Sequence, residues 1–234
     1  MLLLATDTSG KNGSLALARV AARRSQVDVM EIVALAGGTF SAQLVPQIAA
    51  LLSKHGYTQS DLAAFAVVSG PGSFTGLRVG LAAIKALAEV LHKPIAAISL
   101  LEAVAWSSPT RGRILAALDA GRGEIYVGDY ERANEKPGDR EFDPPLRMHS
   151  ERLLTREEFI AEAKRTVVVT PDLALAQTLR TEELQCEQID YPVSGVIARL
   201  GWHRIQQGLT VRPEELEANY IRRSDAEIFS PPRH

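Results

Sequence analysis

The sequence predicts an α/β fold, because apolar segments with the length of strands alternate with segments of helical periodicity along the chain. Of the 234 residues, 46% are hydrophobic and 23% are charged, which is typical of a globular protein and excludes a mainly disordered chain. A strand, a turn containing glycine and a second strand occur near the start of each half of the chain. We therefore expect one or two domains built on mixed sheets.

In the first half, Asn12-Gly13 separates two apolar segments and predicts a hairpin, because both residues tolerate positive φ. Leu44, Ile48 and Leu51 recur at helical spacing and predict a helix. Pro46 limits where that helix can begin, since proline suits only the first turn. The expected strands are 2–7, 14–20, 27–35, 62–69 and 95–98, and the expected helices are 41–55, 77–91 and 100–107.

Residues 109–113 mark a boundary, which divides the chain into subdomains at 1–108 and 109–209. The tail, 210–234, has little core of its own and should return to the first subdomain. Residues 131–145 are charged, contain proline and should form a solvated loop. The strands expected in this half are 114–118, 124–131 and 166–170, and the expected helices are 155–164, 171–180 and 193–207.

The 26 basic and 28 acidic residues leave a net charge of −2, so contact with RNA would need a local basic patch or a partner. Cys186 is the only cysteine, which excludes an intrachain disulfide and a thiolate zinc site and fits a reducing cytosol. Three leucines before Asp7 are too few for a signal peptide, and no run of 18 apolar residues could span a membrane. We expect a soluble, cytosolic protein.

The segment 69–80, SGPGSFTGLRVG, lies between a predicted strand and a predicted helix. The N–H groups and the dipole of a helix start could bind an anion there, but the Gly-Lys-Ser/Thr of a P-loop is absent. The alternative, which the residues alone favour, is that the glycines satisfy tight turns and Thr75 caps the helix.

The helix that follows is apolar on nearly every side, which predicts burial on more than one face. The second face could pack within the same subunit or against another chain, and the residues alone do not decide between these. If another chain covers it, Arg78 and Phe74 should make specific contacts, and Leu81→Glu or Gly80→Arg should abolish pairing without unfolding the monomer. The expected partner interface is Gly70, Gly72, Ser73, Phe74, Thr75, Gly76, Leu77, Arg78, Gly80, Leu81 and Ile84.

Signals for catalysis are weak. No two of the five histidines stand three or four residues apart, so helical metal pairs such as HExxH are absent, and no Gly-x-Ser-x-Gly elbow occurs.

An Asp ends one predicted strand in each half, and such paired loops resemble those that hold phosphates in the actin-like and sugar-kinase superfamily. An isolated Asp at a strand end is more often a turn former. The residues of these two loops are Asp7, Thr8 and Ser9, and Asp119, Gly121 and Gly123.

Together, 69–80, 115–130 (LAALDAGRGEIYVGDY) and 219–223 (NYIRR) resemble the TsaB (YeaZ) family. The resemblance implies two actin-like (ASKHA, ribonuclease H-like) subdomains with mixed sheets flanked by helices. It also implies a non-catalytic scaffold for the paralogue TsaD, which transfers threonylcarbamoyl to the adenosine beside the anticodon of tRNA. The expected partners are TsaD, the ATPase TsaE in a ternary complex and a second copy when TsaD is absent, with tRNA reached only indirectly and no membrane.

TsaD-like enzymes hold a metal with a His-x-x-x-His pair, and alignment through Pro94 places that pair at Leu100 and Val104, which cannot ligate a metal. Their glycine-rich adenosine segment corresponds to residues 170–172, Thr-Pro-Asp, and the glycine of the first loop corresponds to Ser9. The resemblance therefore implies no catalysis, metal or cofactor, although the loop at Asp119 still fits weak nucleotide contact. The alternative is an ATP-dependent transferase or kinase, or a metallopeptidase-like enzyme.

Overall fold

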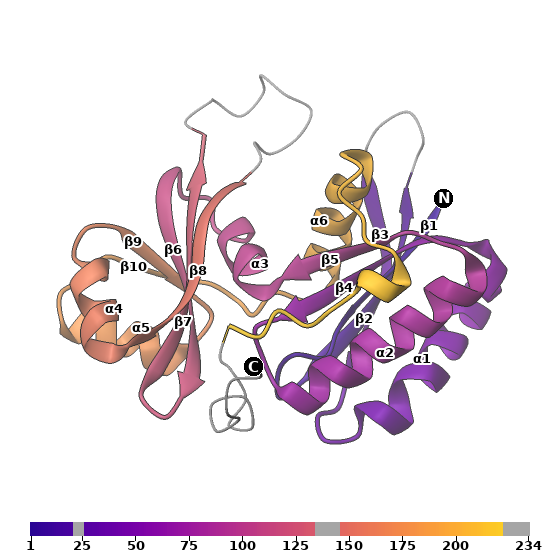
Figure 1. Cartoon of the computed structure of the whole chain (residues 1–234), viewed down its shortest axis with the longest axis horizontal. Helices are drawn as coiled ribbons and strands as arrows, with labels where there is room; N and C mark the ends of the chain where they lie inside the picture. Colours follow the sequence, from indigo (N-terminus) through magenta and orange to yellow (C-terminus); the bar gives the residue numbers. More distant parts are fainter. Residues whose placement is uncertain (21–25, 134–145, 222–234) are drawn as a thin grey trace, which may run out of the picture.

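The computed structural model describes residues 1–20, 26–133 and 146–221 and contains two five-stranded mixed sheets (Figure 1). Most of the predicted solvated loop and the last residues of the tail, including Arg222 and Arg223, lie outside the described residues. The prediction of mixed sheets flanked by helices is confirmed. Among the described residues, no helix has the length and apolarity needed to cross a membrane.

The first sheet has the strand order β3-β2-β1-β4-β5, in which β1, β2 and β3 are antiparallel and β4 and β5 run parallel to β1. The predicted hairpin is present, because β1 pairs with β2. The strands are Leu2–Asp7 (β1), Gly13–Val20 (β2), Val27–Leu35 (β3), Leu62–Gly70 (β4) and Ile95–Ser99 (β5). The helices are Phe40–Lys54 (α1), Phe74–Leu91 (α2) and Leu100–Trp106 (α3), with a 3-10 turn at Gln59–Asp61 (η1).

The second sheet repeats this topology, because its order from β8 is β8-β7-β6-β9-β10, with the same parallel and antiparallel pairings. The strands are Gly112–Gly121 (β6), Glu124–Arg132 (β7), Leu146–Thr155 (β8), Val167–Thr170 (β9) and Cys186–Gln188 (β10). The helices that follow are Arg156–Ala163 (α4), Leu173–Thr181 (α5) and Ser194–Gln206 (α6), and a 3-10 turn lies at Pro213–Glu215 (η2). The sequence did not predict β8 or β10.

Helix α6 differs from the sequence prediction in where it packs. It lies against β1, β2, β4 and β5, and Ile197 and Ala198 are fully buried in the same core cluster as those strands. The prediction that residues up to 209 belong to the second subdomain is therefore wrong for α6. The amphipathic pattern shows that a helix must cover a sheet, but it does not say which sheet.

Helix α3 lies between the two sheets and joins their cores (Figure 1). Leu101 and Val104 are fully buried, and the cluster that contains them extends to Ile114 and Tyr130 of the second sheet. A smaller cluster lies between β6, β7, β9 and helices α4 and α5. The two subdomains are thus connected by a shared apolar core on the side of α3.

Pro46 lies inside α1, beyond its first turn, so the expectation that it limits where this helix begins is wrong. Proline has no N–H, so the carbonyl of Ala42 lacks the hydrogen bond that residue 46 would otherwise donate. Both residues are exposed. Water can therefore hydrate that carbonyl, which reduces the cost of a proline within the helix.

Candidate functional site

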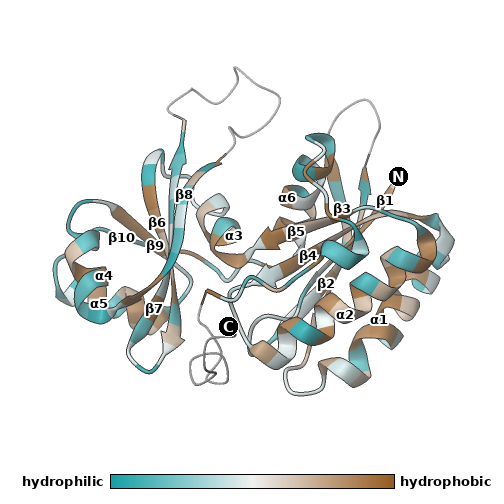
Figure 2. Ribbon diagram, in the orientation of Figure 1, coloured by the Kyte–Doolittle hydropathy of each residue, from teal (hydrophilic) through white to brown (hydrophobic). Residues whose placement is uncertain are grey.

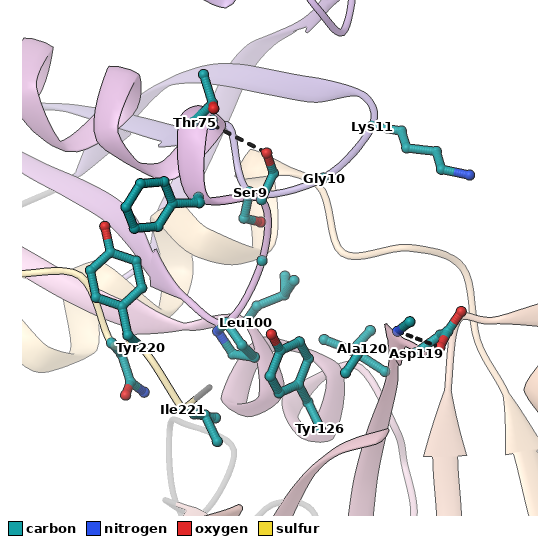
Figure 3. Close-up of a pocket in the computed structure, with 18 of the residues that line it drawn as sticks. Ser9, Gly10, Lys11, Thr75, Leu100, Asp119, Ala120, Tyr126, Tyr220 and Ile221 are labelled. Carbon is teal, nitrogen blue, oxygen red and sulfur yellow. Dashed lines mark hydrogen bonds between the residues drawn. The ribbon is translucent and has the colours of Figure 1, made fainter. Parts of the chain in front are cut away.

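A cleft of about 970 Å³ lies between the two subdomains (Figure 3). Its walls come from the loop after β1, the loop that begins α2, the β6–β7 turn, the start of α5 and residues 219–221 near the C-terminal end. Its size and its mixed aromatic and polar lining are those of a small-molecule site. The structure therefore brings both predicted strand-end loops to one cavity.

The first strand-end loop turns its carboxylate inward. Asp7 is only 1% exposed, and its Oδ1 accepts hydrogen bonds from Ser9 N at 2.8 Å and Ser9 Oγ at 2.5 Å. Burial raises the pKa of Asp7, and the two hydrogen bonds from Ser9 oppose this rise. Thr8 and Ser9 are each 2% exposed, and of the three loop residues only Ser9 lines the cleft. The carboxylate of Asp7 therefore stabilises its own loop and does not line the cleft.

The second strand-end loop is open. Asp119 is exposed and lines the cleft, and its Oδ1 accepts a hydrogen bond from Gly121 N at 2.8 Å (Figure 3). Gly121 and Gly123 have φ of 72° and 78°, a region that favours glycine. Of the two aspartates, Asp119 is therefore the one that a ligand in the cleft could reach.

The glycine-rich loop before α2 packs directly on the first strand-end loop. Ser73 N donates to Ser9 O at 2.7 Å, and a Cβ at Gly72 would lie 2.5 Å from that same oxygen. The N-cap of α2 is Ser73, whose Oγ accepts from Gly76 N at 3.3 Å, so the prediction that Thr75 caps the helix is wrong. The glycines at this loop serve close approach between backbones.

The same close approach continues along the first two turns of α2. Thr8 Oγ1 donates to Gly76 O at 2.8 Å. A Cβ at Gly76 would overlap the carbonyl oxygen of Thr8, and one at Gly80 would overlap the Thr8 hydroxyl. These glycines are therefore required by contacts inside this chain.

Several residues of the predicted partner interface are covered by the chain itself. Leu77 is 1% exposed, Leu81 is 7% exposed and Ile84 is fully buried. Helix α2 is apolar on most sides because β4, α1 and η2 all pack against it. The predicted interface residues that are buried within this chain, and so are not free to meet a partner, are Gly70, Gly76, Leu77, Gly80, Leu81 and Ile84. The expectation that Leu81→Glu or Gly80→Arg leaves the monomer folded is wrong for the same reason.

The other predicted interface residues, Gly72, Ser73, Phe74, Thr75 and Arg78, are exposed. The guanidinium carbon of Arg78 lies 3.7 Å from the centroid of the Phe74 ring, a cation–π contact. The Phe74 ring lies 5.2 Å from that of Tyr220, whose hydroxyl accepts from Arg78 Nε at 3.3 Å. These residues remain available at the surface and also hold the C-terminal segment.

Sequence reasoning expected a partner-facing side on the 77–91 helix, but it did not identify the exposed apolar residues of α1 or those of α2 after Leu81. Val45 is 52% exposed and Val90 is 77% exposed, and other exposed small apolar residues lie on the same two helices, which contact each other. The signal was the i, i+4 spacing of small apolar residues on α2, beginning at Ala82. We call this surface the α1–α2 face, and it comprises Ala42, Val45, Pro46, Ala49, Ala82, Ala86 and Val90.

The positions aligned with the metal-binding histidines lie at the start of α3. Leu100 is 3% exposed and Val104 is fully buried, and Leu100 lines the cleft. Asp172, in the segment aligned with the adenosine site, caps α5 by accepting from Ala174 N at 2.9 Å. Within the described part of the chain, no three His, Cys, Asp or Glu side chains are grouped where they could hold a metal ion.

A family model described as tRNA N6-adenosine threonylcarbamoyltransferase (TsaD) matches residues 34–179. The tRNA threonylcarbamoyladenosine biosynthesis protein TsaB of Bacillus subtilis (strain 168) is 34% identical over 135 residues, 57% of this chain and 57% of that protein. The Haemophilus influenzae protein of the same name is 28% identical over 227 residues, 95% of this chain and 94% of that protein.

Among solved structures, YeaZ from Pseudomonas aeruginosa matches with a TM-score of 0.69 and 23% identity, over 94% of this chain and 99% of that chain. The chain spans little more than half the length of the B. subtilis relative. The structural match confirms the predicted fold class of two actin-like subdomains. Because the family model covers more than half of the chain and the relatives named TsaB agree with it, the chain belongs to the TsaB (YeaZ) family, within the wider family that the TsaD model describes.

Proposed function

We propose that this protein is a non-catalytic partner of a TsaD-type transferase in the formation of threonylcarbamoyladenosine in tRNA. The names of its relatives point to that pathway. The observation that carries a partner role is the α1–α2 face, an exposed apolar surface on two adjacent helices. Exposed patches of this kind mark protein–protein interaction sites.

The composition of the α1–α2 face suits helix packing. Its side chains are small, so the helices of a partner could approach closely. Arg78 and Glu89 are the charged residues of α2 that are exposed, and Figure 2 shows apolar segments along both helices. Arg78 and Phe74 lie in the first turns of α2, where an arginine and an aromatic residue could anchor a contact.

The occupant of this face is TsaD in the working complex and a second copy of this chain when TsaD is absent. The ATPase TsaE would join the pair as a third component. A protein with a net charge of −2 has no general attraction for RNA, so tRNA is reached through the partner. The face and the cleft are separate features, since no residue of the α1–α2 face lines the cleft.

The absence of catalysis is supported by the residues that replace the expected ligands. Leu100 and Val104 have no donor atoms for a metal ion. The Asp7 carboxylate is already occupied by the Ser9 amide and hydroxyl groups. We infer that the scaffold geometry has been kept while the metal and phosphate chemistry has been lost.

The partner role is tested with Ala86→Arg, which places a long charged side chain on the exposed side of α2. Ala174→Arg on the exposed side of α5 is the matched control. Calorimetric titration with the TsaD protein of the same organism should show at least a tenfold loss of affinity for Ala86→Arg, which corresponds to about 1.4 kcal/mol, and no loss for the control. Equal affinity of both variants would refute the assignment of this face.

A second candidate function, an ATP-dependent enzyme, is favoured by the open cleft and by the exposed carboxylate of Asp119. Titration of the isolated protein with ATP and Mg²⁺ separates the two functions. The scaffold role predicts no turnover without the partner. Micromolar binding accompanied by hydrolysis or transfer would favour the enzyme.

A further inference from the structure

The C-terminal segment 209–221, which we call the strap, crosses the first subdomain after α6 (Figure 1). Val211 N donates to Ile95 O at 2.9 Å, and Asn219 N donates to Ser69 O at 2.7 Å. Between them, Leu216 is 4% exposed, and its carbonyl accepts from Lys85 Nζ of α2 at 3.4 Å. The strap is therefore held at several points along the first subdomain.

The side chain of Asn219 connects the strap to the second subdomain. Asn219 Nδ2 donates to Glu151 Oε2 at 2.8 Å, and Glu151 lies on β8. The other carboxylate oxygen of Glu151 accepts from the Tyr130 hydroxyl of β7 and from Ser99 Oγ at the end of β5. One carboxylate thus connects the strap, the first sheet and the second sheet.

The two donors to Oε1 of Glu151 are buried, whereas Asn219 is exposed. Tyr130 is 1% exposed and Ser99 is 9% exposed. Burial raises the pKa of Tyr130 well above its usual value, so its hydroxyl stays protonated and remains a donor. The neighbouring carboxylate of Glu102 is occupied by Arg204 Nη2 at 2.5 Å. Because Glu151 is half-buried, the loss of one of its donors would remove part of the stabilisation of its carboxylate.

Beyond Asn219, the strap forms part of the cleft. Asn219, Tyr220 and Ile221 all line it, and Figure 3 shows Tyr220 and Ile221 among the residues around the pocket. Tyr220 stacks on Phe74 and accepts a hydrogen bond from Arg78. The residues that fasten the strap are therefore next to, or part of, the wall that faces the second subdomain.

We propose that the strap is a latch, in which the Asn219–Glu151 hydrogen bond sets the separation of the two subdomains across the cleft. The subdomains are also joined by the apolar core around α3, which includes Tyr130, and Ser99 directly precedes that helix. Opening at the cleft would require α3 to act as the hinge and the hydrogen bonds of Glu151 to Asn219 and to Ser99 to break. All contacts of the latch lie within this one chain, so the proposal does not depend on the proposed partner function.

The test places a second carboxylate at the latch with Asn219→Asp, which puts like charges against each other in a partly buried position. Glu217→Gln is the matched control, because Glu217 lies on the exposed side of the strap. Spin labels are attached at Glu89→Cys on α2 and Gln177→Cys on α5, both exposed, in a Cys186→Ser background. The distance between the two labels is then measured by pulsed electron–electron double resonance.

The latch predicts a longer and broader distance distribution for Asn219→Asp and the original distribution for Glu217→Gln. An unchanged distribution for Asn219→Asp would overturn the proposal. A rescue variant separates loss of the latch from general damage. In the double variant Glu151→Gln with Asn219→Asp, the amide of the new glutamine can donate to the carboxylate of the new aspartate, so the hydrogen bond is restored with the two roles exchanged. Return of the original distribution supports the latch, and failure of the double variant to restore it overturns the latch.

Discussion

The two subdomains share one strand order, yet their strand-end aspartates have opposite surroundings. Asp7 is buried and hydrogen-bonded within its own loop, whereas Asp119 is exposed at the cleft. The difference comes from the helix that follows the next parallel strand. After β4, a glycine-rich loop brings the 18-residue α2 over the first loop, and after β9 the shorter α5 leaves the second loop open.

The comparison teaches that the environment of a strand-end carboxylate depends on the segment that packs over it. The same local pattern, an apolar strand that ends in Asp, produces a structural group in one half and an accessible group in the other. The first half therefore provides the packing and the proposed partner surface. The second half supplies the open wall of the cleft.

The largest expected effect concerns two glycines, Gly76 of α2, which packs on the first loop, and Gly121, which belongs to the second loop. Gly76→Ala would place a methyl group against the Thr8 carbonyl oxygen, so we expect a loss of about 3 kcal/mol in the free energy of unfolding. Gly121→Ala meets open space and suffers only from positive φ, so its loss should be about 1 kcal/mol. Urea unfolding of both variants measures the difference. A larger loss at Gly121 would reverse the comparison.

A smaller difference is expected for the aspartates themselves. Asp7→Ala leaves the buried Ser9 amide and hydroxyl groups without their acceptor, which should cost about 2 kcal/mol of stability. Asp119→Ala removes one exposed hydrogen bond to Gly121 N and should cost only about 0.5 kcal/mol. The midpoints of chemical unfolding should separate the two variants. Equal midpoints would mean that burial does not distinguish these carboxylates.

The smallest effect is a pH dependence. Because the pKa of Asp7 is raised in the folded state, the folded state binds this proton more strongly than the unfolded state. Stability is therefore lost as pH rises from the ordinary pKa of 3.8 through the folded value, and it is higher below that range. Asp7→Asn should remove this loss, and Asp119→Asn, which keeps Asp7, should retain it. Unfolding curves between about pH 4 and pH 7 test both statements, and the same slope in Asp7→Asn and wild type would contradict them.

Much of the fold could be predicted because hydrophobic periodicity reports burial directly. The sequence could not reveal β8, since Arg147, His149 and Glu151 interrupt its apolar pattern on an edge strand. It could not place α6 either, because an amphipathic helix fits either sheet. Both failures concern which surfaces meet, and neighbouring residues along the chain do not encode that information locally.

For the candidate site too, local sequence patterns predicted the loops but not the contacts between distant segments. The sequence singled out the loops at Asp7 and Asp119, and the structure brings both to one cleft. It could not show that Leu81 and Ile84 are covered within the chain, because an apolar helix pattern does not identify its cover. The roles of Asn219 and Glu151 depend on contact across 68 positions in sequence, and no local pattern indicates such a pair.

The backbone contact between Val211 and Ile95 has a consequence for the behaviour of the protein in concentrated solution. Strand β5 is an edge of the first sheet, and an uncovered edge can pair with the same edge of another molecule. By forming an antiparallel bridge at Ile95, the strap occupies the start of that edge. A chain cut before Val211 should therefore lose a barrier to strand-to-strand aggregation as well as a wall of its cleft.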